Sequence, residues 1–486
     1  MVKKILSVIF LMLALVCVLA SCDSEDVTEN HTSYDAFTFY SKGNGTCLIG
    51  IAPAAKYYEE IIIPSTYNGE QVVGIIKDGF RECEKLKTVV IPDTVVEIEP
   101  RAFELCANLE SVTFCASVQK IGAGAFYGCK SIRDVYFNGT VKDWIYIVFD
   151  SILGNYEEFP NSDKRGFEGS ANPLSGSACS YSSDGANLYF NGERLKNLVI
   201  SEGEPWIGQY AFQGCCSIET VTVSSESIRI GKNAFAKCCN LTSVDLPIEG
   251  DIWEGAFESC SALKSITLPE LGIIASDTFS GCSSLESVVI PDSVTEIRSS
   301  AFSGCSSLES VVIPDGVTDI WSSAFSGCTS LESVVIPDSV TDIWYSAFSE
   351  CSSLKSINIP SSVTWIGQNA FERCRALESI TLPNGITEIK DYTFSGCSSL
   401  KNIVLPGALS TIGRYAFDGC TSLESIKFPH LLSEIGGYAF RDCSSLGNID
   451  YQGDKFKWNN TVTRGYQWDS GTGDYIIRCV DGNIKK

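Results

Sequence analysis

Cysteine is the residue type whose spacing in this chain most invites chemistry. Fourteen of the 22 cysteines follow a phenylalanine by three residues, and successive pairs are almost always 23 residues apart. Such a series could bind metal, form disulfides or pack as small apolar groups. The series lacks clustered C-x-x-C pairs, which disfavours zinc and iron–sulfur sites, and identical side chains pointing the same way do not readily reach a disulfide torsion. We therefore expect a structural ladder of buried thiols without a cofactor, typified by Phe302 and Cys305, Phe325 and Cys328, and Phe348 and Cys351.

Two of the eight cysteines outside this series have a spacing of their own that is informative. Cys216 and Cys239 each directly follow a ladder cysteine and lie 23 residues apart. If neighbouring copies of the repeat stack, these two side chains become neighbours at the surface. The spacing predicts a disulfide between them.

The composition of the chain argues against acid–base catalysis and against metal chemistry. The chain has only two histidines, His31 and His430, which nearly excludes histidine metal sites and Ser-His or Cys-His catalysis. General acid–base catalysis needs two carboxylates in different environments, whereas here the acids recur at equivalent repeat positions. We expect a solvated acidic face and no enzyme activity, with weak calcium binding as the alternative. The rows are Asp292, Asp315 and Asp338; Glu296, Asp319 and Asp342; and Glu286, Glu309 and Glu332.

Aromatic residues give the strongest lead to a ligand. Trp321 and Trp344 follow the repeat isoleucine, where many other copies have glycine, and Trp253 holds the same position earlier in the chain. Tyr345 and Trp365 lie beside that pair. An exposed aromatic row would form a stacking platform for a sugar or a peptide. The alternative is that these rings only cover apolar surface.

The element that positions all these residues is the repeat itself. A fixed period of 23 residues predicts a solenoid, because each unit is too small to bury its apolar face alone. In one copy Leu308, Val311 and Ile313 have the L-x-x-L-x-L spacing of a leucine-rich repeat. We expect an α/β solenoid with one short strand per coil, a long parallel sheet on one face, and short helical or 3₁₀ turns on another. Pro314 ends the strand because it cannot donate to the sheet.

The outward positions of that sheet form a second candidate surface. Ser310 and Val312 should face solvent while Val311 and Ile313 face the core. The resulting face is flat and uncharged, and suits modest-affinity contact with a protein or polymer. Its candidate contacts are Val289, Val312, Val335 and Asn358.

The repeat A-F-x-x-C-x-x-L-x-x-[VI]-x-[IL]-P resembles that of BspA-like leucine-rich repeat proteins over most of residues 57 to 462. This resemblance implies a surface protein that mediates adhesion or protein binding, since the family includes bacterial adhesins that bind host matrix proteins such as fibronectin and fibrinogen. The shared positions are structural, so no binding residue is carried over. A carbohydrate-binding protein and a passive scaffold are the alternatives.

The chain ends predict export. Lys3 and Lys4 precede an apolar run, so residues 1–21 read as a signal peptide, and the residues that end in Cys22 resemble a lipobox whose cysteine becomes lipidated. We expect an acidic stalk at 22–33, a cap and first repeat block at 34–150, an irregular insert at 151–190, a second block at 191–462, and a C-terminal cap at 463–486. The protein would be extracytoplasmic, at the cell surface of a bacterium and anchored by lipid.

The charge balance narrows the class of partner. With 59 acidic and 36 basic residues, the net charge is −23, which argues against nucleic acid and against direct binding to an anionic membrane. We expect contact with the membrane only through the lipid anchor. The expected partner is a surface or matrix protein of a host or neighbouring cell, or a glycan.

Overall fold

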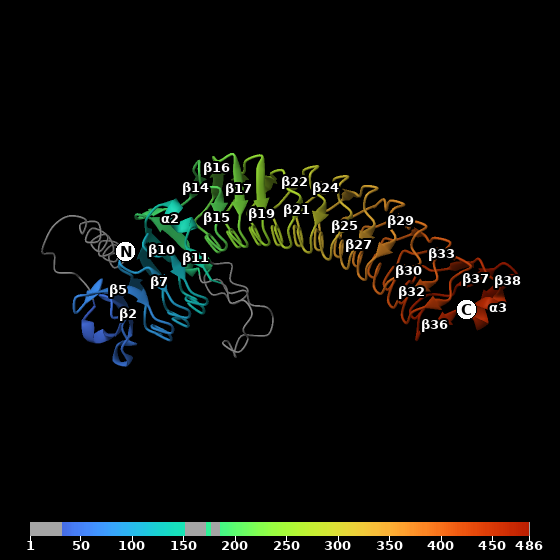
Figure 1. Ribbon diagram of the computed structural model, residues 1–486. Helices are drawn as coiled ribbons and strands as arrows, with labels where there is room; N and C mark the ends of the chain where they lie inside the picture. Colours follow the sequence, from blue (N-terminus) through green and yellow to red (C-terminus); the bar gives the residue numbers. More distant parts are fainter. Residues whose placement is uncertain (1–31, 151–171, 176–184, 486) are drawn as a thin grey trace, which may run out of the picture. The chain divides into compact units, whose positions relative to one another are not determined.

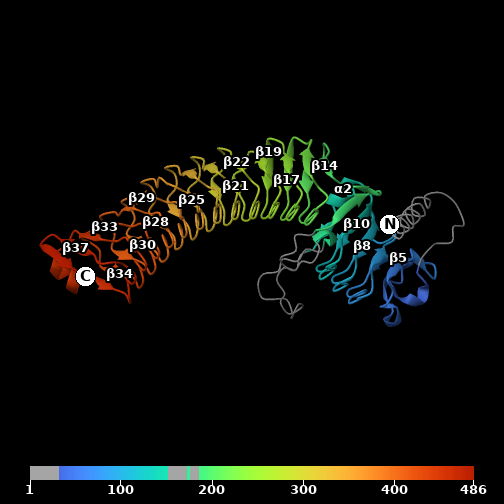
Figure 2. The same ribbon diagram turned by 180° about the vertical axis from the view of Figure 1, so that it is seen from behind.

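The computed structural model describes residues 32–150, 172–175 and 185–485. Within it the chain forms two compact units, residues 1–195 and 196–486. In each unit, coils of 22 or 23 residues stack side by side, as the labelled strands in Figures 1 and 2 show. The solenoid predicted from the repeat is confirmed. The predicted signal peptide, stalk and lipidated Cys22, together with most of the insert, fall outside the described residues.

Most coils contribute two strands rather than the single strand that we predicted. In one coil, β24 (Ser310–Val312) is followed by β25 (Asp319–Ile320), and the two strands lie in different parallel sheets. We call these the first and the second sheet. The second-sheet strands are two to four residues long in most coils, too short for apolar alternation to reveal them. Val311 and Ile313 are buried and Val312 is exposed, as the alternation predicts.

The third side of each coil is built from single turns. Ala301, Cys305 and Leu308 each donate a backbone hydrogen bond to the carbonyl three residues earlier, the 3₁₀ pattern. These turns do not join into a helix because Ser300 and Gly304 adopt φ values of 57° and 72°. Such left-handed residues interrupt any right-handed helix.

Stacked phenylalanines form the core of this side. Phe302 and Phe325 are fully buried, and their ring centroids lie 5.4 Å apart at an interplanar angle of 6°. The amide of Phe302 donates to the carbonyl of Ala324 in the next coil at 2.8 Å. Hydrogen bonds therefore join neighbouring coils on the turn side as well as in both sheets.

In unit 1 the first and the second sheet are each continuous. Its first sheet has the order β13-β12-β10-β8-β6-β3, and its second has β1-β2-β5-β7-β9-β11 with β4 paired to β5. The pairs β1–β2, β4–β5 and β12–β13 are antiparallel, and the remaining pairs are parallel. The strands are β1 (Phe37–Ser41), β2 (Thr46–Ile51), β3 (Glu60–Ile62), β4 (Thr66–Tyr67), β5 (Glu70–Ile75), β6 (Thr88–Val90), β7 (Glu97–Ile98), β8 (Ser111–Cys115), β9 (Lys120–Ile121), β10 (Asp134–Asn138), β11 (Val148–Phe149), β12 (Asn187–Phe190) and β13 (Glu193–Arg194).

Unit 2 shows the same alternation over more coils, although breaks in strand pairing divide its first sheet into four segments and its second sheet into three. Its first-sheet strands are β14 (Asn197–Ile200), β16 (Thr220–Val223), β18 (Ser243–Asp245), β20 (Ser265–Thr267), β22 (Ser287–Val289), β24, β26 (Ser333–Val335), β29 (Ser379–Thr381), β31 (Asn402–Val404), β33 (Ser425–Phe428), β35 (Asn448–Tyr451), β37 (Ile476–Cys479) and β38 (Gly482–Lys485). Its second-sheet strands are β15 (Trp206–Ile207), β17 (Ser227–Ile230), β19 (Glu249–Ile252), β21 (Ile273–Ile274), β23 (Glu296–Ile297), β25, β27 (Asp342–Ile343), β28 (Trp365–Ile366), β30 (Glu388–Ile389), β32 (Thr411–Ile412), β34 (Glu434–Ile435) and β36 (Thr463–Arg464).

Both units end in the same kind of cap. Among the described residues the α-helices are α2 (Val141–Ile145) and α3 (Lys455–Asn460), and each buries one tryptophan, Trp144 or Trp458, in the last coil. Thr140 and Asp454 cap the helix N-termini by accepting backbone hydrogen bonds. The short 3₁₀ helices are η1 (Tyr34–Ala36), η2 (Pro53–Ala55) and η3 (Pro173–Ser175).

Each cap then closes with an antiparallel hairpin, β12–β13 in unit 1 and β37–β38 in unit 2. β12 pairs with β10 in parallel, so Asn187–Phe190 belong to the cap of unit 1, although we placed them within an irregular insert. The repeat signature cannot reveal this hairpin, because its strands lack the Phe and Cys of an ordinary coil.

Candidate binding surfaces

The cysteine ladder lies buried in the core of the coils. The thiol of Cys305 donates to the carbonyl of Phe279 in the preceding coil at 3.2 Å, and Cys351 contacts Phe325 in the same way. Both thiols are unpaired and fully buried, and burial raises their pKa well above the ordinary range. A protonated, hydrogen-bonded thiol is a poor nucleophile and a poor metal ligand. Among the described residues no group of three His, Cys, Asp or Glu is placed to hold a metal ion.

Cys216 and Cys239 lie on adjacent coils, as their spacing predicts. The structure joins them by a disulfide, with their Cα atoms 5.4 Å apart. Cys216 is buried and Cys239 is half-buried. The bridge links two turns near the start of unit 2, and its oxidation state in the exported protein stays a prediction.

A row of exposed valines runs across the first sheet of unit 2. Val289, Val312 and Val335 lie on β22, β24 and β26 with side chains 71%, 66% and 58% exposed. We call these three residues the valine row. Val312 and Val335 are direct register partners in adjacent parallel strands. Asn358 is also exposed one coil further on, where the backbone forms only an isolated bridge at Ser356.

Acidic residues border the valine row at both strand ends. Glu286 and Glu309 precede the strands, Asp292 and Asp315 follow them, and all four side chains are exposed. None of the four has an ion-pair partner among the described residues, whereas Glu332 pairs with Lys355 at 2.8 Å. The surface is thus an apolar strip between two negatively charged margins.

The tryptophan cluster consists of Trp321, Trp344, Tyr345 and Trp365 on the second sheet. Trp321 and Trp344 stack face to face, with centroids 5.1 Å apart and an interplanar angle of 4°. Trp344 and Trp365 are tilted by 56° at 5.2 Å, and Tyr345 meets Trp365 edge to face at 5.3 Å. The three tryptophans are half-buried and Tyr345 is 49% exposed.

This geometry differs from the flat platform that we expected. Because Trp321 and Trp344 each cover one face of the other, no sugar ring fits between them. A stacked ligand is left with outer faces and the corner at Tyr345 and Trp365. Trp253 lies apart from the cluster, 47% exposed, and packs edge to face with Trp206. The glycan hypothesis stays a prediction with a smaller contact area than the sequence suggests.

One aromatic row escaped the sequence interpretation. Tyr392, Tyr415 and Tyr438 stack on consecutive turns, with centroid distances of 4.8 and 5.0 Å. Arg441 lies over Tyr415 and Tyr438 and forms a two-pronged ion pair with Asp418. The sequence did contain a signal for this row, because each of the three tyrosines precedes a ladder phenylalanine by two residues. Other coils carry Ser or Asn there with the same left-handed backbone.

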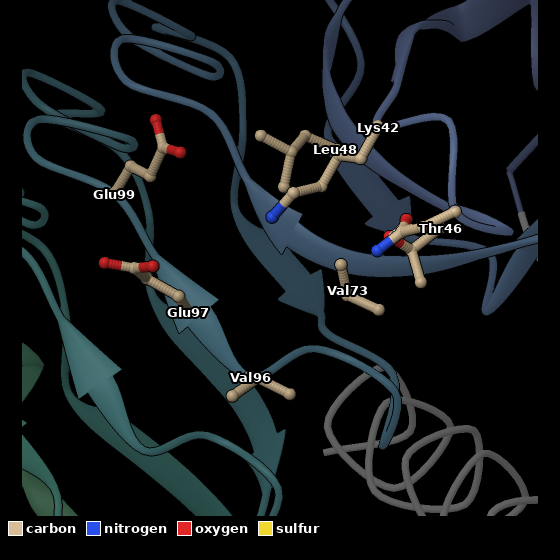
Figure 3. Close-up of a pocket in the computed structure, with 8 residues that line it drawn as sticks. Lys42, Thr46, Leu48, Val73, Val96, Glu97 and Glu99 are labelled. Atoms are coloured by element: carbon tan, nitrogen blue, oxygen red, sulfur yellow. Dashed lines mark hydrogen bonds between the residues drawn. The ribbon is translucent and has the colours of Figure 1, made fainter.

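A shallow depression in unit 1 offers no catalytic constellation. Lys42, Leu48 and Val96 line it together with two acids, Glu97 and Glu99, on and beside β7 (Figure 3). Both acids already have partners, because Glu97 pairs with Lys120 at 3.4 Å and Glu99 accepts the amide of Lys77 at 2.8 Å. Among the described residues, none of the helices has the length and apolar character required to cross a membrane.

Comparison with known proteins agrees with the repeat architecture. The profile of the BspA-type leucine-rich repeat region matches in six copies, over residues 55–161, 185–271, 250–377 and 365–461. No curated protein shows significant similarity to the chain.

Similar solved structures include bacterial leucine-rich repeat proteins. A leucine-rich repeat protein from Bacteroides ovatus is 26% identical, with 92% of this chain and 99% of that one covered and a TM-score of 0.49. A leucine-rich cell surface protein from Faecalibacterium prausnitzii is 25% identical, with 91% and 99% covered and a TM-score of 0.44. The profile match spans well over half of the sequence, and the chain belongs to the BspA-type leucine-rich repeat family.

Proposed function

We propose that this protein is a non-catalytic cell-surface adhesin that binds another protein through the first sheet of unit 2. Proteins of this family typically act in protein–protein contact or surface binding, and they are typically extracellular or surface-exposed. Lipidation of Cys22 would hold the chain at the membrane. Repeat side chains in equivalent environments provide no acid–base pair, and the ladder thiols are protonated and buried.

The observation that carries this proposal is the exposure of the valine row. Apolar side chains exposed at equivalent positions of consecutive coils form a contiguous patch, and such patches on soluble proteins mark interaction sites. The paired parallel strands β24 and β26 hold Val312 and Val335 about 5 Å apart on a rigid backbone, so little conformational entropy is lost on binding.

The acidic margins define the chemistry of the partner. A partner that covers the valine row also approaches Glu309 and Asp315, whose charges have no counter-ion among the described residues. A matching surface therefore carries an apolar ridge with lysine or arginine on its flanks. Charge complementarity of this kind raises association rates and suppresses unsuitable partners.

The test is binding of the purified chain to immobilised fibronectin, fibrinogen and mucin by surface plasmon resonance. Replacing Val312→Ser and Val335→Ser together should weaken binding of the recognised protein about tenfold, or about 1.4 kcal/mol. Val404→Ser is the matched control, because Val404 is 56% exposed at the equivalent position of another strand, β31, but lies outside the row. If the double variant binds as well as the parent, the valine row is not the contact surface. If the parent binds none of the three immobilised proteins, the proposed matrix-adhesin function is wrong.

A further inference from the structure

In two coils of unit 2, an acid in the second sheet forms an ion pair with a base two residues later in the chain. Glu296 and Arg298 flank Ile297, and Glu388 and Lys390 flank Ile389. Residues two apart in a strand lie on the same face. Accordingly Arg298 Nε donates to Glu296 at 3.0 Å, and Lys390 Nζ donates to Glu388 at 2.5 Å. In these coils the chain itself neutralises the outward carboxylate.

Two coils that lie between these have the acid but not the base. Asp319 and Asp342 are the register partners that follow Glu296, but Trp321 and Trp344 replace the expected cation two residues later. Asp319 accepts only neutral donors, Thr318 Oγ1 at 2.8 Å and Trp344 Nε1 at 3.2 Å. Asp342 accepts Thr341 Oγ1 at 2.6 Å. Neither aspartate has an ion-pair partner in the described part of the chain, so two adjacent charges stay uncompensated beside aromatic rings.

Aromatic rings and carboxylates together form a receptor for an organic cation. Trp344, Tyr345 and Trp365 meet at angles of 56° to 85°, and Tyr345 is half exposed. A lysine or arginine side chain is attracted to ring faces by cation–π interaction and to carboxylates by charge. Arg298 and Lys390 show that such a side chain fits this position of the strand when the chain supplies it.

We propose that Asp319, Asp342 and the tryptophan cluster bind lysine or arginine side chains of an extended basic segment in a partner protein. The two aspartates lie about 5 Å apart across parallel strands, and alternate residues of an extended peptide lie about 7 Å apart. Two cations spaced one residue apart can therefore reach both carboxylates. A metal ion fits less well, because calcium requires six to eight oxygen ligands and the described residues hold no group of three potential ligands here.

This site lies on a different sheet from the valine row, so either proposal can fail alone. The probe is a fluorescein-labelled peptide of sequence Gly-Lys-Gly-Lys-Gly, with its acetyl-lysine form as the uncharged comparison. Binding to the whole chain is measured by fluorescence anisotropy at low and at physiological salt. We expect binding of the lysine peptide that weakens with salt and is absent for the acetylated peptide.

The most informative variant gives Asp319 and Asp342 a cation from the chain itself. Trp321→Arg with Trp344→Arg recreates the acid-Ile-Arg arrangement of Glu296 to Arg298 and should weaken peptide binding about three- to tenfold, as expected for losing exposed ion pairs and a cation–π contact. Asp319→Asn with Asp342→Asn should have a similar effect with nearly unchanged shape. Glu202→Gln with Glu226→Gln is the matched control, because both glutamates are exposed and belong to neither proposed surface, and all three double variants raise the net charge by two.

The outcomes separate a site from general attraction to an acidic protein. Binding that is reduced by the tryptophan and aspartate variants but not by the glutamate control supports the proposal. Equal reduction in all three double variants means non-specific attraction and overturns it, as does unchanged binding by the Asp→Asn pair. The circular dichroism spectrum and the urea midpoint of each variant establish that it is folded. If the Trp→Arg double variant does not fold, the Asp→Asn double variant alone tests the proposed site.

Discussion

The thiol of Cys328 donates a hydrogen bond to the backbone carbonyl of Phe302, one coil earlier, with sulfur and oxygen 3.2 Å apart. Both residues are fully buried, and Cys351 repeats the contact on the next coil with Phe325. The carbonyl lies in a coil interior, where an unpaired acceptor is costly. Cysteine at this position therefore fills a small apolar space and also satisfies a backbone group of its neighbour.

Replacing Cys328→Ala should destabilise unit 2 by about 1–3 kcal/mol, because the change leaves a small cavity and an unpaired carbonyl. The measurement is the midpoint of urea unfolding followed by circular dichroism. Ser306→Ala is the control, since the Ser306 hydroxyl also donates to the preceding coil, at 3.1 Å, but at an exposed site. That variant should stay within about 0.5 kcal/mol of the parent. Equal effects would mean that burial of the cysteine contact has no special importance.

Alkaline pH should weaken the fold. Burial raises the pKa of the Cys328 and Cys397 thiols to about 12, above the roughly 8.5 of an unfolded chain. Their stabilising contribution is full below that lower value and is lost as pH rises toward 12, because only the unfolded state releases these protons in between. The urea midpoint should fall steadily from about pH 9 upward. A Cys328→Ala/Cys397→Ala variant should show a shallower fall, and an identical slope would contradict this origin.

Removing the bridge between Cys216 and Cys239 should destabilise the first coils of unit 2. A closed loop of 23 residues corresponds to about 3 kcal/mol in the chain-entropy model. Non-reducing peptide mapping by mass spectrometry should detect the cross-linked pair in the exported protein. The Cys216→Ser variant should have a lower urea midpoint, and reductant should shift the parent to the same value. Free sulfurs on both residues would disprove the bridge.

Periodicity predicted the coil because a 23-residue repeat of Phe, Cys, Leu and alternating aliphatics leaves few ways to bury its apolar side chains. The burial of Phe302, Cys305 and Val311 and the exposure of Val312 all follow from that pattern. The adjacency of Cys216 and Cys239 follows from it as well. These features depend on position within the repeat, which the sequence displays directly.

The repeat pattern could not predict how the aromatic rings are oriented or how charges are balanced between coils. The equivalent positions of Trp321 and Trp344 indicate that the rings are neighbours, but not that they cover each other's faces. The tyrosine row arises from a turn whose left-handed backbone the sequence does not mark, since Ser300 and Tyr415 share it. The second sheet was missed because a two-residue strand has no alternation to read.

The glycine position of the second sheet gives the sharpest test of coil spacing. A Cβ atom on Gly367 would lie 2.6 Å from the backbone nitrogen of Tyr345, a contact that only a backbone shift relieves. Gly367→Ala should therefore lower stability by about 1–3 kcal/mol, the range for overpacking a close-packed interior. Gly407→Ala is the matched control, because nothing lies within 4 Å of its Cβ position, and we expect it to be neutral or slightly stabilising. Comparable urea midpoints for the two variants would show that glycine at position 367 is not required by the close approach of Tyr345.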